Sequence, residues 1–473
     1  MRKKGLLQNI SYALVANIFN AAATMVTSLL IPRAFGSDLD AYGYYQIYFF
    51  YVSYVGFFHF GLCDGILLRI GGMEYSDLQK DRYASQFWLL LLAECVISAG
   101  IMLVVRLTTA TQVYTYIYFM VCLNLVVLNL QTYLLYILQG TSRIKEYSFI
   151  TISYRALYCA FIIVALLLKY ADLHMYVAID LVSKFLSVIV GVYWCKEIIF
   201  QKFRLSKELA REIFENISSG VKLLIANISG LLTNGIVRIG IQSHWDVATY
   251  GKVSLSLTLT HAFLTIVNAV SLVLYPTLRR TNKARIPSFY RNTRNVLVYL
   301  MAACFILYYP ICQVLGLWLP QYSDSLIYLG ILLPMSLYSV KASLLVNTLL
   351  KVYRQEKTIM TANLVSIIVA VLTTAVSIYV FNSLDMALFA ILLNTMVKTM
   401  VSDWFLSKVI DVKIAADLIE ELLIAVVFVV SSWIIGGYVG MGIYFASLIV
   451  LFLFRGKRFV SSLKETVSVS LKA

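Results

Sequence analysis

Apolar stretches of about twenty residues alternate with short polar gaps along the whole chain. A helix that crosses the hydrocarbon core of a bilayer needs about 20 mainly apolar residues. The pattern therefore predicts an all-α, polytopic membrane protein with about 14 transmembrane helices. Their expected bounds are 8–32, 43–68, 84–105, 113–138, 147–168, 175–195, 217–241, 248–275, 295–318, 326–350, 358–381, 385–407, 418–437 and 440–454.

Basic residues are distributed unevenly between the gaps. Of the 39 Lys and Arg residues, twenty-nine lie in every second gap, three lie in the other gaps and seven lie inside the apolar stretches. Short loops rich in Lys and Arg stay on the cytoplasmic side of a membrane. The pattern therefore predicts that both termini are cytoplasmic.

The two halves of the chain share short motifs in the same order. The tripeptide Asn-Ile-Ser occurs at 9–11 and 216–218, and Leu-Arg occurs at 68–69 and 278–279, at offsets of 207 and 210. Six helices per half is an even number, so both halves have the same orientation in the bilayer. We expect an N-terminal six-helix lobe (1–200), a cytoplasmic amphipathic linker with a short interfacial helix (201–216), a C-terminal six-helix lobe (217–409), and an appended two-helix hairpin with a cytoplasmic tail (410–473).

Composition excludes several classes of function. Hydrophobic residues make up 60% of the chain and charged residues 13%, too few charges to solvate a globule of 473 residues. The net charge of +15 is spread over loops beside apolar spans, which favours contact with membrane lipids over nucleic acid. The seven cysteines all lie in apolar stretches without CxxC spacing, and we expect no metal site and no cofactor.

Neither a phosphate-binding GxxxxGK[ST] motif nor HExxH is present. We therefore expect a transporter and not an enzyme. The rival enzyme class is a membrane-embedded glycan polymerase or acyltransferase, which needs a substantial catalytic loop, and no such loop is visible in the sequence.

Several short segments resemble Wzx-type polysaccharide flippases of the multidrug/oligosaccharidyl-lipid/polysaccharide exporter superfamily. They are residues 30–36, 42–45, 60–62, 68–69 and 246–251. The resemblance implies two six-helix lobes around a central cavity that opens alternately to either side of a bacterial inner membrane. It implies a polyprenyl-pyrophosphate-linked oligosaccharide as substrate, for O-antigen, capsule or exopolysaccharide, with glycan polymerase machinery as a further partner.

Charged residues within the predicted spans are the best candidates for a site, because each costs on the order of 3 kcal/mol in hydrocarbon. Seven cations lie within the spans, and Lys222 and Lys252 lie close enough to span ends to snorkel. The candidates are the other five, Arg155, Lys184, Arg238, Lys341 and Lys398, of which Lys184 and Lys398 lie in the sixth helix of their respective halves. Cations in a low-dielectric cavity attract an anionic diphosphate headgroup, and we expect at least two of the five to bind it. The alternative is that they form buried ion pairs that hold helices together.

The candidates for ion coupling are Glu94, Asp64 and Asp180. A buried carboxylate can load and release H⁺ or Na⁺ during a transport cycle. The alternative for Glu94 is a structural hydrogen bond, and the alternative for Asp180 is an ion pair with Lys184, four residues later on the same helix.

Two related functions remain open at this stage. One is a multidrug or small-molecule cation antiporter of the toxin-extrusion family, and the other is a lipid II-type flippase. A cation antiporter would prefer an acidic cavity, whereas seven cations and four acids (Asp64, Glu94, Asp180 and Asp403) lie in the predicted spans when Asp385, Glu420 and Glu421 near the span ends are set aside. The charge balance therefore favours an anionic substrate.

Overall fold

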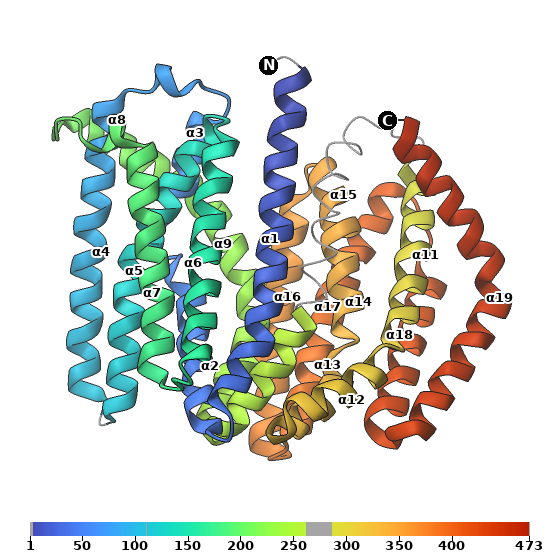
Figure 1. Ribbon diagram of the computed structural model, residues 1–473. Coiled ribbons are helices and arrows are strands. Elements are labelled where there is room, and N and C mark those ends of the chain that lie inside the picture. Colours follow the sequence, from blue (N-terminus) through green and yellow to red (C-terminus); the bar gives the residue numbers. More distant parts are fainter. Residues whose placement is uncertain (1–2, 110, 262–285, 473) are drawn as a thin grey trace. The chain divides into compact units, whose positions relative to one another are not determined.

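The computed structural model describes residues 3–109, 111–261 and 286–472. Within these ranges the chain forms helices joined by short turns, without any strand (Figure 1). This arrangement confirms the predicted all-α fold class. The end of the predicted span 248–275 and the Leu-Arg pair at 278–279 lie outside the described residues.

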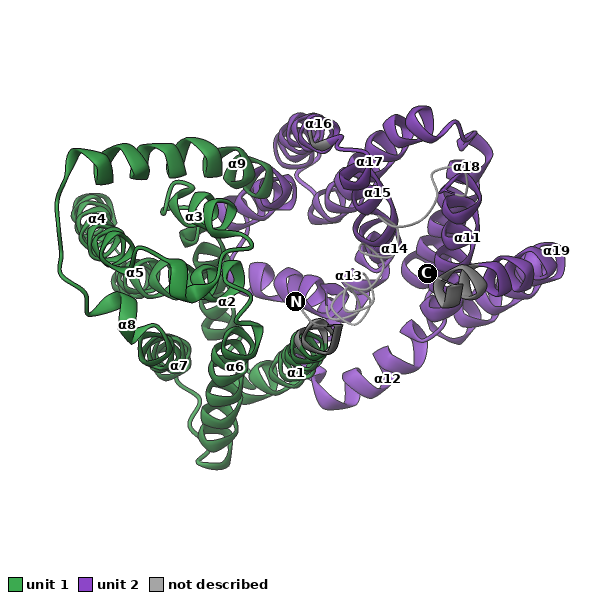
Figure 2. Ribbon diagram, turned by 90° about the horizontal axis from the view of Figure 1, so that it is seen from above, with its two compact units in different colours: residues 1–228 green, residues 229–473 purple. Residues whose placement is uncertain are grey.

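The chain divides into two compact units, residues 1–228 and residues 229–473 (Figure 2). The first unit contains α1 (Lys3–Phe35), α2 (Leu39–Val55), α3 (Leu62–Ile70), α4 (Lys80–Thr108), α5 (Gln112–Gly140), α6 (Ile144–Leu167), α7 (Leu173–Trp194), α8 (Lys196–Ile199) and the first part of α9 (Lys207–His244), with the short 3₁₀ helix η1 (Tyr75–Asp77) before α4. Helix α5 is central to this unit, because it packs against α2, α3, α4, α6 and α7.

The second unit begins inside α9 and continues with a helix over residues 247–261. Its remaining helices are α11 (Ile286–Phe305), α12 (Tyr308–Trp318), η3 (Pro320–Tyr322), α13 (Ser323–Leu332), α14 (Met335–Lys341), η4 (Ala342–Val346), α15 (Asn347–Val352), α16 (Glu356–Ala375), η5 (Val376–Val380), α17 (Leu384–Ile410), α18 (Ala415–Val429), η6 (Val430–Ile435) and α19 (Gly437–Lys472). Helix α17 is central here and packs against α13, α14 and α16, while α19 packs along α11.

Ten helices in the described part of the chain are long and apolar enough to span a membrane, or up to twelve if two bent pairs each count as one span. The bent pairs are Ile286–Phe305 with Tyr308–Trp318 and Pro320–Leu332 with Met335–Val352, bent by 43° and 50°. This number indicates a multi-pass membrane protein. Two other predicted spans do not each correspond to one continuous helix in the described residues. The span 248–275 is described only to residue 261, and the span 43–68 is interrupted.

The interruption separates α2 from α3. Helix α2 ends at Val55, and Gly61 has a φ of 88° immediately before α3. Such a φ favours glycine, because a Cβ clashes with the backbone in this conformation. The side-chain amide of Asn129 on α5 donates to the Val55 carbonyl oxygen at 3.0 Å. The Phe58 N–H donates to the same oxygen at 3.1 Å, so the side chain adds a second donor where the helical hydrogen bonds end.

The predicted interfacial helix is not a separate element. Residues 207–216 are the first turns of α9, which continues without a break to His244. These turns are fixed against α3 and α4, because the buried Glu212 pairs with Arg82 at 3.2 Å and with Arg69 at 3.7 Å. The two helices α3 and α9 also touch directly: a Cβ at Gly65 would overlap the carbonyl oxygen of Asn216. Close packing and ion pairs thus replace the expected surface helix.

Candidate functional site

Lys184 on α7 lies in a closed polar cluster inside the first unit. Its ammonium group is 2.7 Å from Asp180 Oδ2 and donates to Asn124 Oδ1 at 2.9 Å. The hydroxyl groups of Tyr48 and Tyr154 donate to the two oxygens of Asp180 at 2.6 and 2.9 Å. The side chains of Lys184 and Asp180 are 5% and 0% exposed. Because each charge has its partners, this geometry is that of a buried structural ion pair.

Arg155 on α6 lies beside this cluster and is half-buried. Its guanidinium lies over the ring of Tyr154, 4.9 Å from the ring centre. Among the described residues it has no carboxylate partner. Arg155 is therefore a candidate cation without an ion pair to an acid in the described part of this unit.

The two remaining acidic candidates of this unit have different surroundings. Asp64 on α3 is 3.7 Å from His59 Nε2. Glu94 on α4 is fully buried, and neither of its carboxyl oxygens has a hydrogen-bond partner in the described structure. Glu94 is thus the acidic candidate whose polar atoms are left unpaired.

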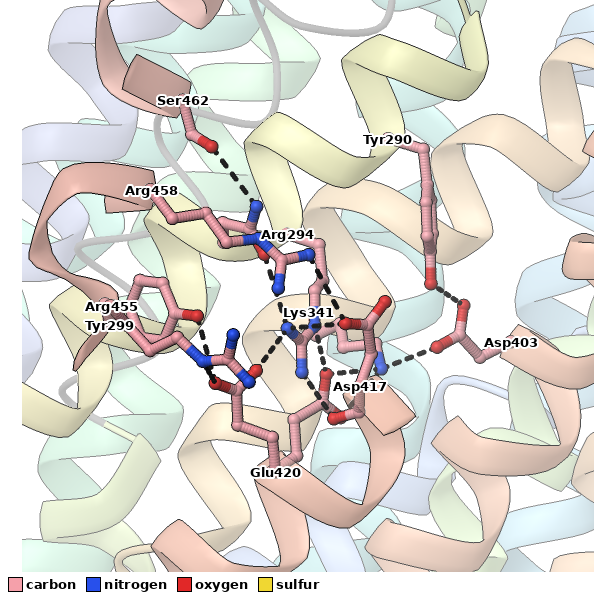
Figure 3. A network of polar contacts seen from close by, with 12 residues as sticks. Tyr290, Arg294, Tyr299, Lys341, Asp403, Asp417, Glu420, Arg455, Arg458 and Ser462 are labelled. Carbon is pink, nitrogen blue, oxygen red and sulfur yellow. Dashed lines mark hydrogen bonds and ion pairs between the residues drawn. The ribbon is translucent and has the colours of Figure 1, made fainter. Parts of the chain in front are cut away.

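Lys341 on α14 belongs to a second buried network, in the second unit (Figure 3). Its ammonium group lies 2.5 Å from Asp403 Oδ2 and 2.8 Å from Glu421 Oε2. Arg294 on α11 pairs with the same Glu421 at 2.8 Å and with Glu420 at 2.9 Å. The side chain of Arg294 is fully buried. Lys341 is therefore engaged on two sides by carboxylates.

The network balances its charges and joins the C-terminal hairpin to the rest of the unit (Figure 3). Four cations and four carboxylates take part, namely Arg294, Lys341, Arg455, Arg458, Asp403, Asp417, Glu420 and Glu421. Three of the carboxylates lie on α18, while Arg294 and Lys341 lie on α11 and α14. Tyr290 on α11 also donates to Asp403 at 2.6 Å. The arrangement supports a structural role for Lys341.

Two residues of the network, Arg294 and Glu421, were not among the candidates predicted from the sequence. Arg294 lies just before the predicted span 295–318, whereas α11 begins at Ile286 and includes it. Glu420 and Glu421, at the start of the predicted span 418–437, were not counted among the acids within spans. A pair of adjacent acids inside an apolar stretch was the available signal.

Lys398 on α17 differs in its surroundings from the buried lysines Lys184 and Lys341. Its nearest described hydrogen-bond acceptor is the Gly230 carbonyl oxygen at 3.5 Å, and no carboxylate pairs with it in the described ranges. It lines a small polar pocket of about 170 Å³ inside the second unit. The other lining residues are Gly230, Thr233, Asn234, Ser339, Ala342, Ser343, Asn347, Thr395 and Thr399.

The chemistry of this pocket suits an anion. It contains one ammonium group, the hydroxyl groups of serine and threonine, and the amides of Asn234 and Asn347, and it contains no acid. Hydroxyl and amide groups donate hydrogen bonds to phosphate oxygens, and a cation strengthens such bonds. The pocket is therefore the candidate site that the geometry favours.

Arg238 on α9 completes the predicted set. Its guanidinium donates to the hydroxyl oxygens of Tyr250 and Ser254 at 3.0 and 3.1 Å. The structure thus brings Lys184, Asp180 and Arg155 together in the first unit. It places Lys341, Lys398 and Arg238 in three separate surroundings in the second unit, and the predicted central cavity stays a prediction.

No family model and no curated protein matches this chain. Solved structures do match it. The lipid II flippase MurJ in an inward closed conformation has a TM-score of 0.65 at 12% identity, covering 95% of this chain and 99% of that chain. An inward-facing multidrug resistance MATE family transporter of the MOP superfamily has a TM-score of 0.60 at 13% identity, covering 84% and 98%. A MOP superfamily transporter from Pyrococcus furiosus has a TM-score of 0.50 at 14% identity, covering 85% and 95%. The chain has the polytopic helical fold of these membrane transporters.

Proposed function

We propose that this protein is a flippase that moves a polyprenyl-pyrophosphate-linked oligosaccharide across the bacterial cytoplasmic membrane. The observation that carries the proposal is the Lys398 pocket, where a half-buried ammonium group without a carboxylate partner in the described structure lies among hydroxyl and amide donors. A buried charge without a counter-charge costs free energy, and this cost is recovered when an anionic ligand binds. A diphosphate headgroup supplies that anion.

The fold supports transport as the kind of activity. Multidrug resistance MATE family transporters with this fold are described in an inward-facing and in an outward-facing conformation, with TM-scores of 0.60 and 0.54 to this chain. Fold alone does not determine the substrate. The Pyrococcus furiosus transporter is described as having a binding pocket of reversed polarity that suggests a different function. The charge of the pocket in each chain therefore carries the argument about substrate.

The membrane potential favours the proposed direction. Moving one elementary charge through 100 mV is worth about 2.3 kcal/mol. An anionic headgroup that moves outward runs with a potential that is negative inside. Export of an acidic lipid-linked sugar is thus assisted by the potential without nucleotide hydrolysis.

Export of cationic small molecules is the competing function. A cationic drug would be repelled by Lys398 and would find no carboxylate in the pocket. The Asp180 carboxylate of the first unit is already bound by Lys184 and two tyrosines. The described geometry therefore favours an anionic substrate over a cationic one.

The test measures binding to the full-length protein in lipid nanodiscs. The ligands are a polyprenyl diphosphate and the matching uncharged polyprenol, and the variants are Lys398→Gln and the control Lys408→Gln. Lys408 lies on the same helix, outside the pocket, over the ring of Trp404. We expect Lys398→Gln to weaken binding of the diphosphate at least tenfold and to leave binding of the polyprenol unchanged.

A flipping assay in proteoliposomes with purified lipid-linked oligosaccharide completes the test. We expect transport by the wild type and by Lys408→Gln, and loss of transport by Lys398→Gln. Equal diphosphate binding by both variants would show that Lys398 does not hold the headgroup. Binding of a cationic dye that the diphosphate does not displace would favour drug export instead.

A further inference from the structure

Glu94 lies in the middle of α4 with its carboxyl group sealed inside the first unit. The residue is fully buried, and neither Oε1 nor Oε2 has a hydrogen-bond partner among the described residues. No Lys or Arg pairs with it in the ranges that the structure describes. A carboxylate in such a place has lost its hydration without gaining a donor or a counter-charge, which costs several kcal/mol. The neutral, protonated form avoids this cost.

Asn129 on α5 is the polar neighbour of Glu94. Its amide nitrogen donates one hydrogen to the Val55 carbonyl oxygen and the other to the Leu125 carbonyl oxygen, both at 3.0 Å. Its Oδ1 is buried and has no donor among the described residues. Turning the amide over would place Oδ1 against two carbonyl oxygens, so the observed orientation is the one that the hydrogen bonds require.

Both oxygens of Glu94 are buried without a hydrogen-bond donor among the described residues. Both amide hydrogens of Asn129 are engaged by backbone carbonyl oxygens, so this neighbour does not satisfy a Glu94 carboxylate. A protonated carboxyl group is neutral and supplies one O–H donor. We propose that the Glu94 carboxyl group is a proton-binding site, occupied in this conformation, beside the break between α2 and α3.

A proton explains the geometry better than a metal ion does. Hard cations such as Ca²⁺ and Mg²⁺ take about six or more oxygen ligands. The unpaired oxygens here are three, from Glu94 and Asn129. No group of three or more His, Cys, Asp or Glu residues in the described chain is arranged to hold a metal ion.

Cys63 on α3 is the titratable group that interacts electrostatically with Glu94. Asp64, Tyr133 and Tyr136 are in turn neighbours of Cys63, and His59 is a neighbour of Asp64. Asp64 is the other acid, and its partner is His59 at 3.7 Å. None of these groups is a Lys or Arg that would hold Glu94 in its charged form. Asp64 offers a matched control, because it is a second acid of the same region with a partner of its own.

The site has a mechanical consequence. If Glu94 released its proton, the carboxylate would need donors, and the nearby amide of Asn129 would have to turn its hydrogens toward it. The Val55 carbonyl oxygen at the end of α2 would then lose one of its two donors and keep only the Phe58 N–H. Proton occupancy is therefore linked to the hydrogen bonding of the α2–α3 break, and the link stands independently of the substrate proposed above.

The test is infrared spectroscopy of the full-length protein in lipid nanodiscs, as a difference between the wild type and Glu94→Gln across a pH series. We expect the wild type to show a band of a protonated carboxyl group that is absent from Glu94→Gln and present in Asp64→Asn. Asn129→Leu removes the polar neighbour of Glu94, so we expect it to keep the band and to shift its frequency. Glu94→Asp keeps a carboxyl group at the site and serves if the Gln variant does not fold.

Two results would overturn the proposal. One is a difference spectrum without a protonated carboxyl band at any pH, which would show that Glu94 is ionised. The other is thermal stabilisation by Na⁺, but not by choline, that disappears in Glu94→Gln, which would assign the site to a metal ion. Neither readout depends on the lipid-linked substrate, so failure here is distinct from failure of the proposed function.

Discussion

Helices α7 and α17 are the sixth spans of the two halves in the repeat predicted from the sequence, and each carries one lysine within its predicted span. Lys184 on α7 has Asp180 one turn before it, and the two side chains form a buried ion pair at 2.7 Å. Lys398 on α17 has Asn394 at the matching position one turn before it. The residue one turn before the lysine therefore differs between the helices. It is an acid where the lysine is charge-balanced, and an amide where the lysine faces a polar pocket.

The two helices therefore use their lysines differently. The paired lysine holds α7 to α5 through Asn124 and cannot attract an anion while Asp180 balances it. The lysine without a carboxylate contributes less to packing and leaves its charge for a ligand. Four substitutions test this contrast, from the largest expected effect to the smallest.

Removing the acid from α7 should have the largest effect. Asp180→Asn leaves the buried ammonium group of Lys184 without a counter-charge and deprives Tyr48 and Tyr154 of a charged acceptor. Breaking a buried pair by removing one partner costs about 3–5 kcal/mol. We expect a loss of this size in the free energy of unfolding, measured in detergent.

The control for this variant is Asp172→Asn, at the start of the same helix, where the acid is exposed and contacts His174. We expect the control to change stability by less than about 0.5 kcal/mol. A loss below about 1 kcal/mol for Asp180→Asn would show that Lys184 does not depend on its acid, and the contrast between α7 and α17 would fail.

Lys341 should resemble Lys184, and not Lys398, in its contribution to stability. Lys341→Met removes a cation from Asp403 and Glu421, although Glu421 keeps Arg294 and Asp403 keeps Tyr290. We expect a loss of about 3 kcal/mol in unfolding free energy, at the lower end of the range for broken buried pairs. Diphosphate binding by the folded protein should remain. A stable variant that no longer binds the diphosphate would move Lys341 from the structural to the ligand-binding group.

Converting α17 to the pattern of α7 should weaken binding at little cost to the fold. In Asn394→Asp the new carboxylate would lie one turn from Lys398, as Asp180 does from Lys184. The Asn394 side chain tolerates the change, because Oδ1 accepts from Thr373 at 3.3 Å while Nδ2 has no described partner. We expect diphosphate affinity to fall about tenfold, or 1.4 kcal/mol. Unchanged affinity in the titration would contradict a charge-based site.

The smallest effect on stability belongs to Lys398 itself. Lys398→Gln breaks no ion pair with a described residue. We expect the unfolding free energy to change by less than about 1 kcal/mol, although binding is lost. A loss comparable to that of Asp180→Asn would mean that Lys398 has a structural role, and the two lysines would then be equivalent.

Most of the fold was predictable because apolar length and charge distribution depend on few rules. The predicted spans 418–437 and 440–454 begin within a few residues of α18 and α19, but α19 continues to Lys472, well past the predicted end at 454. The break in the span 43–68 was not predicted, because the hydrophobic pattern continues through Gly56 and Gly61 and only backbone geometry reveals it.

The candidate residues were found by one criterion, charge within an apolar span, but the criterion does not reveal partners. Asp180 and Lys184 are four residues apart, so their pairing was visible in the sequence. The partner of Lys341 is Glu421, eighty residues away, and only tertiary structure brings the two together. Lys398 and Glu94 differ from the paired candidates because neither has an ion-pair partner among the described residues. No sequence pattern indicates the absence of a partner.

The order in which the chain is made gives the Arg294 network a further meaning. Each carboxylate that pairs with Arg294 lies on α18, more than 120 residues after it. A ribosome therefore releases α11 with an uncompensated guanidinium long before α18 is synthesised. Assembly of the second unit has to wait for its last hairpin, and a nascent chain that stops short of residue 417 presents the membrane quality-control machinery with an exposed positive charge.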